Sequence, residues 1–194
     1  MTTMRNKAHD LAAWAFRGDQ RILPDANFWL NVLSPSIGLA RPRHSREYSA
    51  AYRRILLAKS ALFVDVLIMS EIVNVLARQS FTESFKRQYV GRHGQPDFKA
   101  YRNSSDFVTP ARIISGECRK ILRQCTRLDH AFSEWDFNAL LSGFEASGED
   151  FNDQLLIEMA KKHALLLLTD DGDMVSGGLD VLTANRRLLA ACPA

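Results

Sequence analysis

The chain has 194 residues, 46% hydrophobic and 24% charged, with only 10 Gly and 6 Pro. This composition excludes collagen-like, low-complexity and disordered chains, and the length predicts one globular domain. No apolar stretch approaches the ~18–20 residues that cross a bilayer, so we expect no membrane span. The three cysteines and the lack of an extended apolar N-terminal segment lead us to expect a cytoplasmic protein with reduced thiols and no secretory signal.

The formal net charge of +3 is distributed unevenly, with +6 on residues 1–97 and −3 on residues 98–194. Arginines are dense in residues 41–54, and carboxylates are dense in residues 149–153 and 170–173. Separated acidic and basic regions suit a protein that holds metal ions beside a polyanion. An ordinary solvated surface is the alternative, and the charge asymmetry taken alone favours it.

Apolar spacing predicts helices that alternate with short strands. Helices are expected over residues 6–17, from just after residue 25, over 45–59 with Ser45 as N-cap, from a cap at Ser70, and over 111–128, 136–146 and 152–163. Strands are expected to end near residue 25 and to cover residues 62–69, 165–168 and 181–183. Residues 80–110, rich in turn formers, aromatic and basic side chains, are expected to form an inserted or poorly packed segment. This order predicts an α/β sandwich with a mostly parallel central sheet.

Acidic residues recur at the predicted strand ends and helix starts: Asp25, Glu71, Asp153 and Asp171, with Asp173 two positions later. The carboxyl ends of parallel strands form the ligand crevice of an open sheet, so these groups are expected to converge. Convergent carboxylates suit Mg²⁺ or Mn²⁺, which activates water and stabilises the leaving oxygen of a phosphodiester. Each one alone also fits a structural role, as a helix cap, a first-turn carboxylate or an Asp–Gly turn. The four together favour a site.

Four segments resemble, in order, the motifs of the PIN-domain family, metal-dependent ribonucleases that include the toxins of type II toxin–antitoxin pairs. They are Pro24–Leu30, Met69–Leu76, Asn152–Ala160 and Leu168–Met174. The resemblance lies in the ordered set of motifs and not in any single one. The resemblance covers residues 20–190 and implies a PIN-like α/β/α sandwich. Residues 1–19 are then an N-terminal helical extension, and residues near 80–110 are an insertion into the nuclease domain.

The resemblance implies an endoribonuclease that uses Mg²⁺ or Mn²⁺ to cleave RNA. Its catalytic, metal-binding carboxylates would be Asp25, Glu71, Asp153 and Asp171, its auxiliary ligand Asp173, and its orienting groups Asn27 and Thr169. Three nearby carboxylates compete for these positions: Asp65, Asp150 and Asp170. The resemblance also implies a toxin with a cognate antitoxin, and a homodimer. A catalytically inactive PIN-like module that binds RNA or a protein is the second hypothesis.

Basic side chains provide candidate RNA contacts: Arg41, Arg43, Lys86, Arg87 and Arg92. Aromatic residues among those of the 80–110 segment would stack on single-stranded bases, and a solvated loop is the alternative interpretation. Other chemistries lack their signatures. The histidines and cysteines show no zinc-ligand spacing, and neither a phosphate-binding glycine loop nor a Gly-x-Ser-x-Gly motif occurs.

Overall fold

The apolar runs form a six-stranded sheet at the centre of the molecule. The computed structural model describes residues 4–34, 38, 42–86, 97–129, 132–147 and 150–194. The strands are β1 (Lys7–Asp10), β2 (Arg21–Pro24), β3 (Ala61–Val64), β4 (Cys125–Arg127), β5 (Leu166–Leu168) and β6 (Asp180–Thr183). They lie in the order β1-β6-β5-β2-β3-β4, and every neighbouring pair is parallel. The predicted α/β class with a parallel sheet is confirmed.

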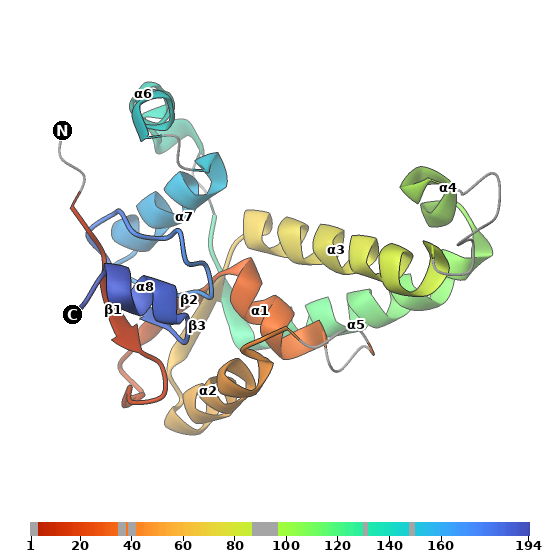
Figure 1. The fold of residues 1–194 in the computed structure, drawn as a ribbon, viewed down its shortest axis with the longest axis horizontal. Helices are drawn as coiled ribbons and strands as arrows, with labels where there is room; N and C mark the ends of the chain where they lie inside the picture. The colour runs from red at the N-terminus through yellow and green to blue at the C-terminus, as the bar shows by residue number, and fades with distance from the viewer. Residues whose placement is uncertain (1–3, 35–37, 39–41, 87–96, 130–131, 148–149) are drawn as a thin grey trace.

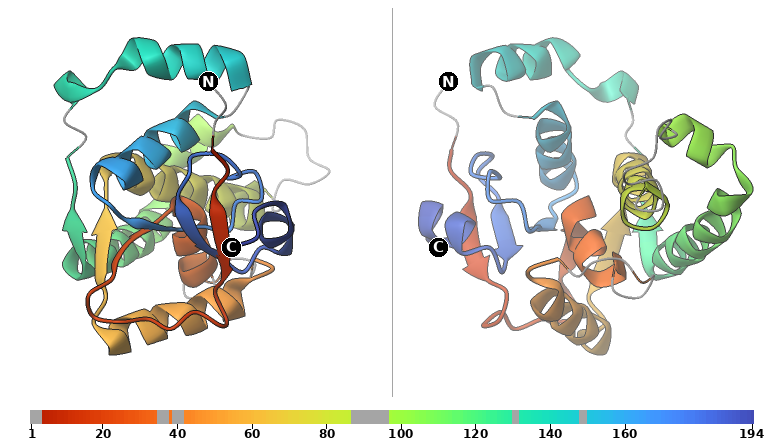
Figure 2. Two further views of the ribbon diagram at one scale, coloured as in Figure 1. Left: turned by 90° about the vertical axis from the view of Figure 1, so that its left-hand side faces the viewer. Right: turned by 45° about the vertical axis from the view of Figure 1, so that its right-hand side comes forward.

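Helices connect and flank the strands. They are α1 (Ala26–Leu33), α2 (Ser45–Ala58), α3 (Val66–Ser80), α4 (Phe98–Arg102), α5 (Val108–Gln124), α6 (Phe137–Ser147), α7 (Phe151–Lys162) and α8 (Arg186–Ala191), with short turns η2 (Phe81–Phe85), η4 (Ser105–Phe107) and η5 (Phe132–Glu134). The chain runs outward from β2 to β4 and returns across the sheet to β5, so right-handed crossovers place the intervening helices on opposite faces. Figures 1 and 2 show α7 and α2 on opposite sides of the strands, as in an α/β/α sandwich. Within the described ranges, none of the helices combines the length and apolar character that crossing a bilayer requires.

Apart from the exposed Arg21 at the start of β2, the two central strands are apolar because helices cover both of their faces. Ile22 and Leu23 of β2 and Leu167 of β5 are fully buried. Helix α1 adds Phe28 and Trp29, which meet edge to face with ring centroids 5.1 Å apart. Burying each side chain of this size stabilises the fold by roughly 1.5–3 kcal/mol. The ends of these strands, where the candidate site lies, are therefore held rigidly.

The N-terminal segment corrects one prediction, because it contains a strand and not the expected helix of residues 6–17. β1 pairs in parallel with β6, from Lys7 opposite Asp180 to Asp10 opposite Thr183. Ala8 is buried, and its backbone N–H donates to the Cys192 carbonyl at 2.7 Å. Pairing with a distant strand outweighs the local helical pattern. Residues 7–10 are an edge of the central sheet and not part of a helical extension.

The predicted strand over residues 62–69 is correct only as far as Val64. Asp65 accepts a hydrogen bond from the backbone N–H of Ile68 at 2.8 Å and caps α3, which therefore begins at Val66 and not after Ser70. Two further differences concern the end of α5 and the C-terminal helix. The predicted helix of residues 111–128 ends at Gln124 and gives way to β4, and helix α8 was not predicted.

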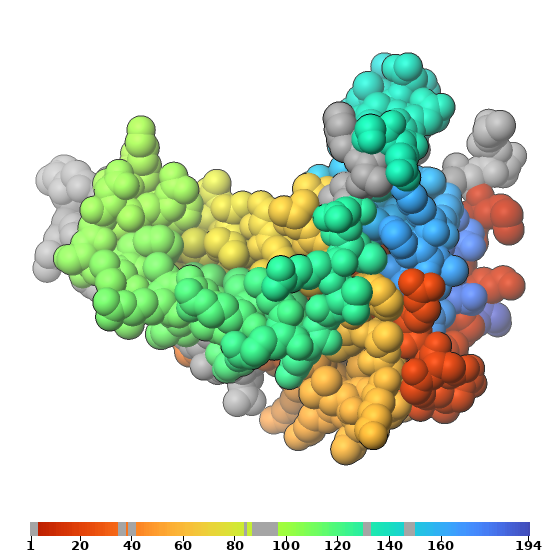
Figure 3. Space-filling view, turned by 180° about the vertical axis from the view of Figure 1, so that it is seen from behind, coloured from red at the N-terminus to blue at the C-terminus, as the bar shows by residue number. Residues whose placement is uncertain are grey.

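Residues 81–107, where described, enclose an aromatic cluster around the buried Tyr101, which corrects the expectation of a poorly packed segment. Tyr101 is 1% exposed, with its ring centroid 4.7 Å from Phe85, 5.5 Å from Phe81 and 5.2 Å from Phe107. These rings join the end of α3 to α4 and the start of α5. Figure 1 shows α3, α4 and α5 projecting from the sheet as an arm, and Figure 3 shows the same arm in yellow and green as a projection of the surface. Of the aromatic side chains that the sequence offered for base stacking, Phe85 and Tyr101 pack on one another instead, and Tyr89 lies outside the described residues.

Candidate active site

The site lies where the direction of the chain connections reverses. β2 and β5 are neighbours, but the chain leaves β2 towards β3 and leaves β5 towards β6. Open α/β sheets bind ligands outside the carboxyl ends of strands at such a point. Asp25 directly follows β2, and Thr169 directly follows β5, where the Asp25 backbone N–H donates to the Leu168 carbonyl at 3.0 Å. The fold thus brings together two motifs that are far apart in sequence.

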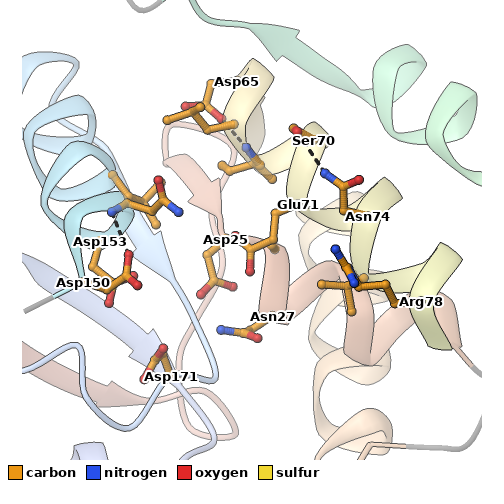
Figure 4. Close-up of a pocket in the computed structure, with 16 residues that line it drawn as sticks. Asp25, Asn27, Asp65, Ser70, Glu71, Asn74, Arg78, Asp150, Asp153 and Asp171 are labelled. Atoms are coloured by element: carbon orange, nitrogen blue, oxygen red, sulfur yellow. Dashed lines mark hydrogen bonds between the residues drawn. The ribbon is translucent and has the colours of Figure 1, made fainter. Parts of the chain in front are cut away.

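A cavity of about 520 Å³ opens at this edge, and all four predicted catalytic carboxylates line it. Its acidic lining residues are Asp25, Asp65, Glu71, Asp150, Asp153 and Asp171, and its other polar ones are Asn27, Ser70, Asn74, Arg78 and Asn152. Figure 4 shows that these residues lie on several separate elements. Six carboxylates from across the chain therefore face one space.

Asp25 is held from two sides. Its Oδ1 accepts the backbone N–H of Phe28 at 2.7 Å, so it caps α1, and its Oδ2 accepts the hydroxyl of Thr169. The same Thr169 oxygen accepts the backbone N–H of Asp171 at 2.9 Å. The capping role that the sequence offered as an alternative is real, yet Asp25 also lines the cavity. Thr169, which is fully buried, links the two acidic positions as an orienting residue.

Glu71 reaches the cavity from the second turn of α3. Asn74 and Arg78 follow it at helical spacing, and all three line the cavity. Because Glu71 lies inside the helix and not at its start, a capping role does not explain this residue. Its carboxylate is available to a ligand in the cavity.

Helix α7 contributes the carboxylates on the far side of the cavity. Asp150 is its N-cap and accepts the backbone N–H of Asn152 at 2.7 Å. Asp153 lies in the first turn of the same helix. Both are favoured there by the helix dipole, and both line the cavity. In Figure 4 they lie opposite Glu71, with Asp25 between.

Burial and mutual repulsion disfavour the charged forms of two carboxylates in the site. Burial is the main cause that raises the pKa of Asp25 to about 7; the charges of Asp171 and Glu71 raise it further, against the hydrogen bonds from Thr169 and Phe28. Burial, with the charges of Asp150 and Asp171, also raises the pKa of Glu71. A bound cation would offset the free-energy cost of holding these carboxylates in their charged forms.

The donor set fits a hard divalent cation, since carboxylate and amide oxygens line the cavity. Within the described ranges, however, no three His, Cys, Asp or Glu side chains are grouped closely enough to hold a metal ion as they stand. Mg²⁺ commonly keeps several waters and uses only one or two carboxylates directly, so a preassembled cage is not required. The fit therefore rests on ligand type and charge.

Two predicted or competing acidic residues lie elsewhere. Asp173 does not line the cavity; its Oδ1 lies 2.7 Å from Arg187, and its backbone N–H donates to Asp171 Oδ1 at 2.8 Å. The carboxylate of Asp170 is paired within the fold. Its Oδ1 lies 2.7 Å from His44 Nδ1 and accepts the Tyr48 hydroxyl at 3.0 Å. The role expected for Asp173 thus changes from ligand to support of Asp171.

The two predicted RNA contacts that the structure describes are not brought together with the carboxylates. Arg43 and Lys86 are exposed, and neither lines the cavity. Arg41, Arg87 and Arg92 lie outside the described residues.

Sequence reasoning missed some of the residues that line the cavity. Arg78 and Asn74 went unnoticed, although their spacing from Glu71 along one helical face was a usable signal. Asp65 was named only as a competitor, although it follows an apolar run just as Asp25 does.

Comparisons with known proteins add little. No protein-family model and no curated protein matches the sequence. Among solved structures, the chain is similar to the crystal structure of PAE2754 from Pyrobaculum aerophilum, with a TM-score of 0.44 and 17% identity over 94% of this chain and 96% of that one. A similarity of this size says nothing about activity or substrate.

Proposed function

We propose that this protein is a divalent-metal-dependent nuclease of the PIN-like type that cleaves RNA. The observation that carries the proposal is the convergence of Asp25, Glu71, Asp153 and Asp171 on one cavity at the carboxyl ends of the central strands. Structural roles explain some of these residues singly, but they do not explain why all face the same space. The order of the motifs along the chain supports the PIN-like assignment.

The carboxylates would hold Mg²⁺ or Mn²⁺ directly or through its bound waters, and the charges of Asp25, Glu71 and Asp171 act on one another there. When bound, such an ion supplies a nucleophilic water and stabilises the leaving oxygen of a phosphodiester. Thr169 keeps the Asp25 carboxylate and the Asp171 backbone in fixed positions. Asn27 brings an amide into the same cavity, where it can donate to a phosphate oxygen or a water.

Cleavage of RNA by the purified protein tests the proposal. A mixed pool of single-stranded and transfer RNA is incubated with Mn²⁺ or Mg²⁺, and in parallel with excess chelator. We expect cutting only with the metal. Cutting that continues at full rate in chelator would contradict a metal-dependent mechanism.

The inactive binding module is the second candidate. It predicts RNA affinity without cutting, retained both in chelator and after Asp171→Asn. The convergence of four carboxylates on one cavity favours the nuclease, because a module without catalysis has no need to retain this set. The toxin role, a cognate antitoxin and a homodimer remain narrower proposals that rest on the motif resemblance.

A further inference from the structure

Arg78 is the exception in the cavity lining. The cavity has six acidic side chains, whereas Arg78 is its one basic lining residue among those described. An acidic cavity repels an RNA backbone wherever no cation intervenes. A basic group at its edge therefore bears directly on how a polyanion is bound.

The position of Arg78 separates it from the carboxylates. It follows Glu71 by seven residues on α3, which is almost two turns, so both lie on one face about 10 Å apart along the helix axis. Figure 4 shows Arg78 on the side of the cavity away from Asp150 and Asp153. Arg78 thus stands at the rim, beyond the place where the reacting phosphate would lie.

The guanidinium of Arg78 is oriented by an aromatic ring of α4. It lies over the ring of Phe98, 4.9 Å from the centroid, and the guanidinium of Arg102 lies 5.2 Å from the same centroid. Neither arginine forms an ion pair with a carboxylate among the described residues. Two guanidinium groups beside one ring, without a carboxylate, favour an anion, and guanidinium binds phosphate oxygens in a bidentate manner.

We propose that Arg78, held by Phe98, binds a backbone phosphate next to the scissile one and so positions the RNA across the cavity. This rests on the proposed nuclease function, since the reacting phosphate lies among the carboxylates. Arg102 adds positive charge at the same point. Arg78 is a positioning residue in this account, because it meets the substrate away from the reacting atoms.

The test compares Arg78→Gln with Arg21→Gln. Arg21 is a matched control: it is also exposed and lies over a ring, 5.0 Å from the centroid of Phe63, but it begins β2, at the opposite end of that strand from the cavity. We expect Arg78→Gln to raise KM roughly tenfold or more while kcat stays within about twofold, since one charged hydrogen-bond partner is lost. The slope of log KM against log salt should fall by about 0.7–0.9, as for one phosphate contact. Arg21→Gln should leave KM, kcat and the salt slope unchanged. Arg78→Lys, which keeps the charge, should retain the salt slope.

An Arg78→Gln variant with the KM and salt slope of the Arg21→Gln control would overturn the inference. Failure of the nuclease proposal looks different, because the wild-type protein would then not cleave RNA with any metal. In that event, fluorescence anisotropy of a labelled single-stranded RNA measures the contact directly in Mg²⁺, which screens the carboxylates and then causes no cleavage. Weaker binding by Arg78→Gln alone supports the role of Arg78, and equal or absent binding overturns it.

Discussion

Replacing Asp25 with Asn should lower the rate of metal-dependent RNA cleavage by at least about 10³-fold, which corresponds to about 4 kcal/mol of transition-state stabilisation. Asn keeps the shape of the side chain and an oxygen that can accept the Phe28 N–H or the Thr169 hydroxyl. It removes the charge that would hold the cation. The loss should therefore appear in kcat under saturating RNA, with the circular dichroism spectrum of the fold unchanged.

Asp173→Asn is the matched control, because it makes the same chemical change two residues from Asp171 at a side chain outside the cavity. We expect this variant to keep cleavage within about threefold of wild type, since its exposed pairing with Arg187 contributes little. Equal losses in both variants would mean that the cavity is not the catalytic centre.

The metal-free protein should become less stable as the pH rises from about 4 to about 7. Burial raises the pKa of Asp25 to about 7 in the folded state, while the unfolded chain titrates near its ordinary value of 3.8. Between these values the folded state retains a proton that the unfolded state has released. The free energy of unfolding therefore falls as the pH rises through this window.

A shift of this size corresponds to a loss on the order of 4 kcal/mol at most, at about 1.4 kcal/mol per pKa unit. Urea unfolding at pH 4 and pH 8 in chelator measures it. Asp25→Asn should lose less stability between these pH values and exceed the wild type at pH 8. An identical pH dependence in the two proteins would show that Asp25 does not titrate with a raised pKa. Glu71, whose pKa is also raised, adds a change of the same sign to both proteins.

Local patterns were sufficient for the central part of the fold. The apolar runs before Asp25 and Asp171 predicted the two strands whose carboxyl ends form the site, because fully buried parallel strands are apolar throughout. The same rule applied to Leu62–Val64, but the apolar residues after Asp65 extended the predicted strand too far. The cap that Asp65 makes with Ile68 is a three-dimensional contact that the composition of the run does not reveal.

The parts that the sequence missed depend on distant contacts. β1 is a strand because β6 lies beside it, although its own residues have a helical pattern. The arm is ordered by four rings around Tyr101 that come from three short segments, and the turn-forming residues between these segments hide the cluster in the sequence. Asp173 resembled a ligand by its spacing, and only the direction of its side chain towards Arg187 removes it from the site.

The most direct test of the account is a calorimetric titration of Mn²⁺ into the metal-free wild-type protein and into Asp25→Asn at pH 7. Repeating it in buffers of different ionisation enthalpy counts the protons released. The account predicts saturable binding to the wild type with release of about half a proton, because a group with a pKa of about 7 is half protonated there and must ionise to bind the cation. Binding to Asp25→Asn should be much weaker. Saturable binding of equal strength in both proteins, or none in the wild type, would contradict a metal site built on these carboxylates.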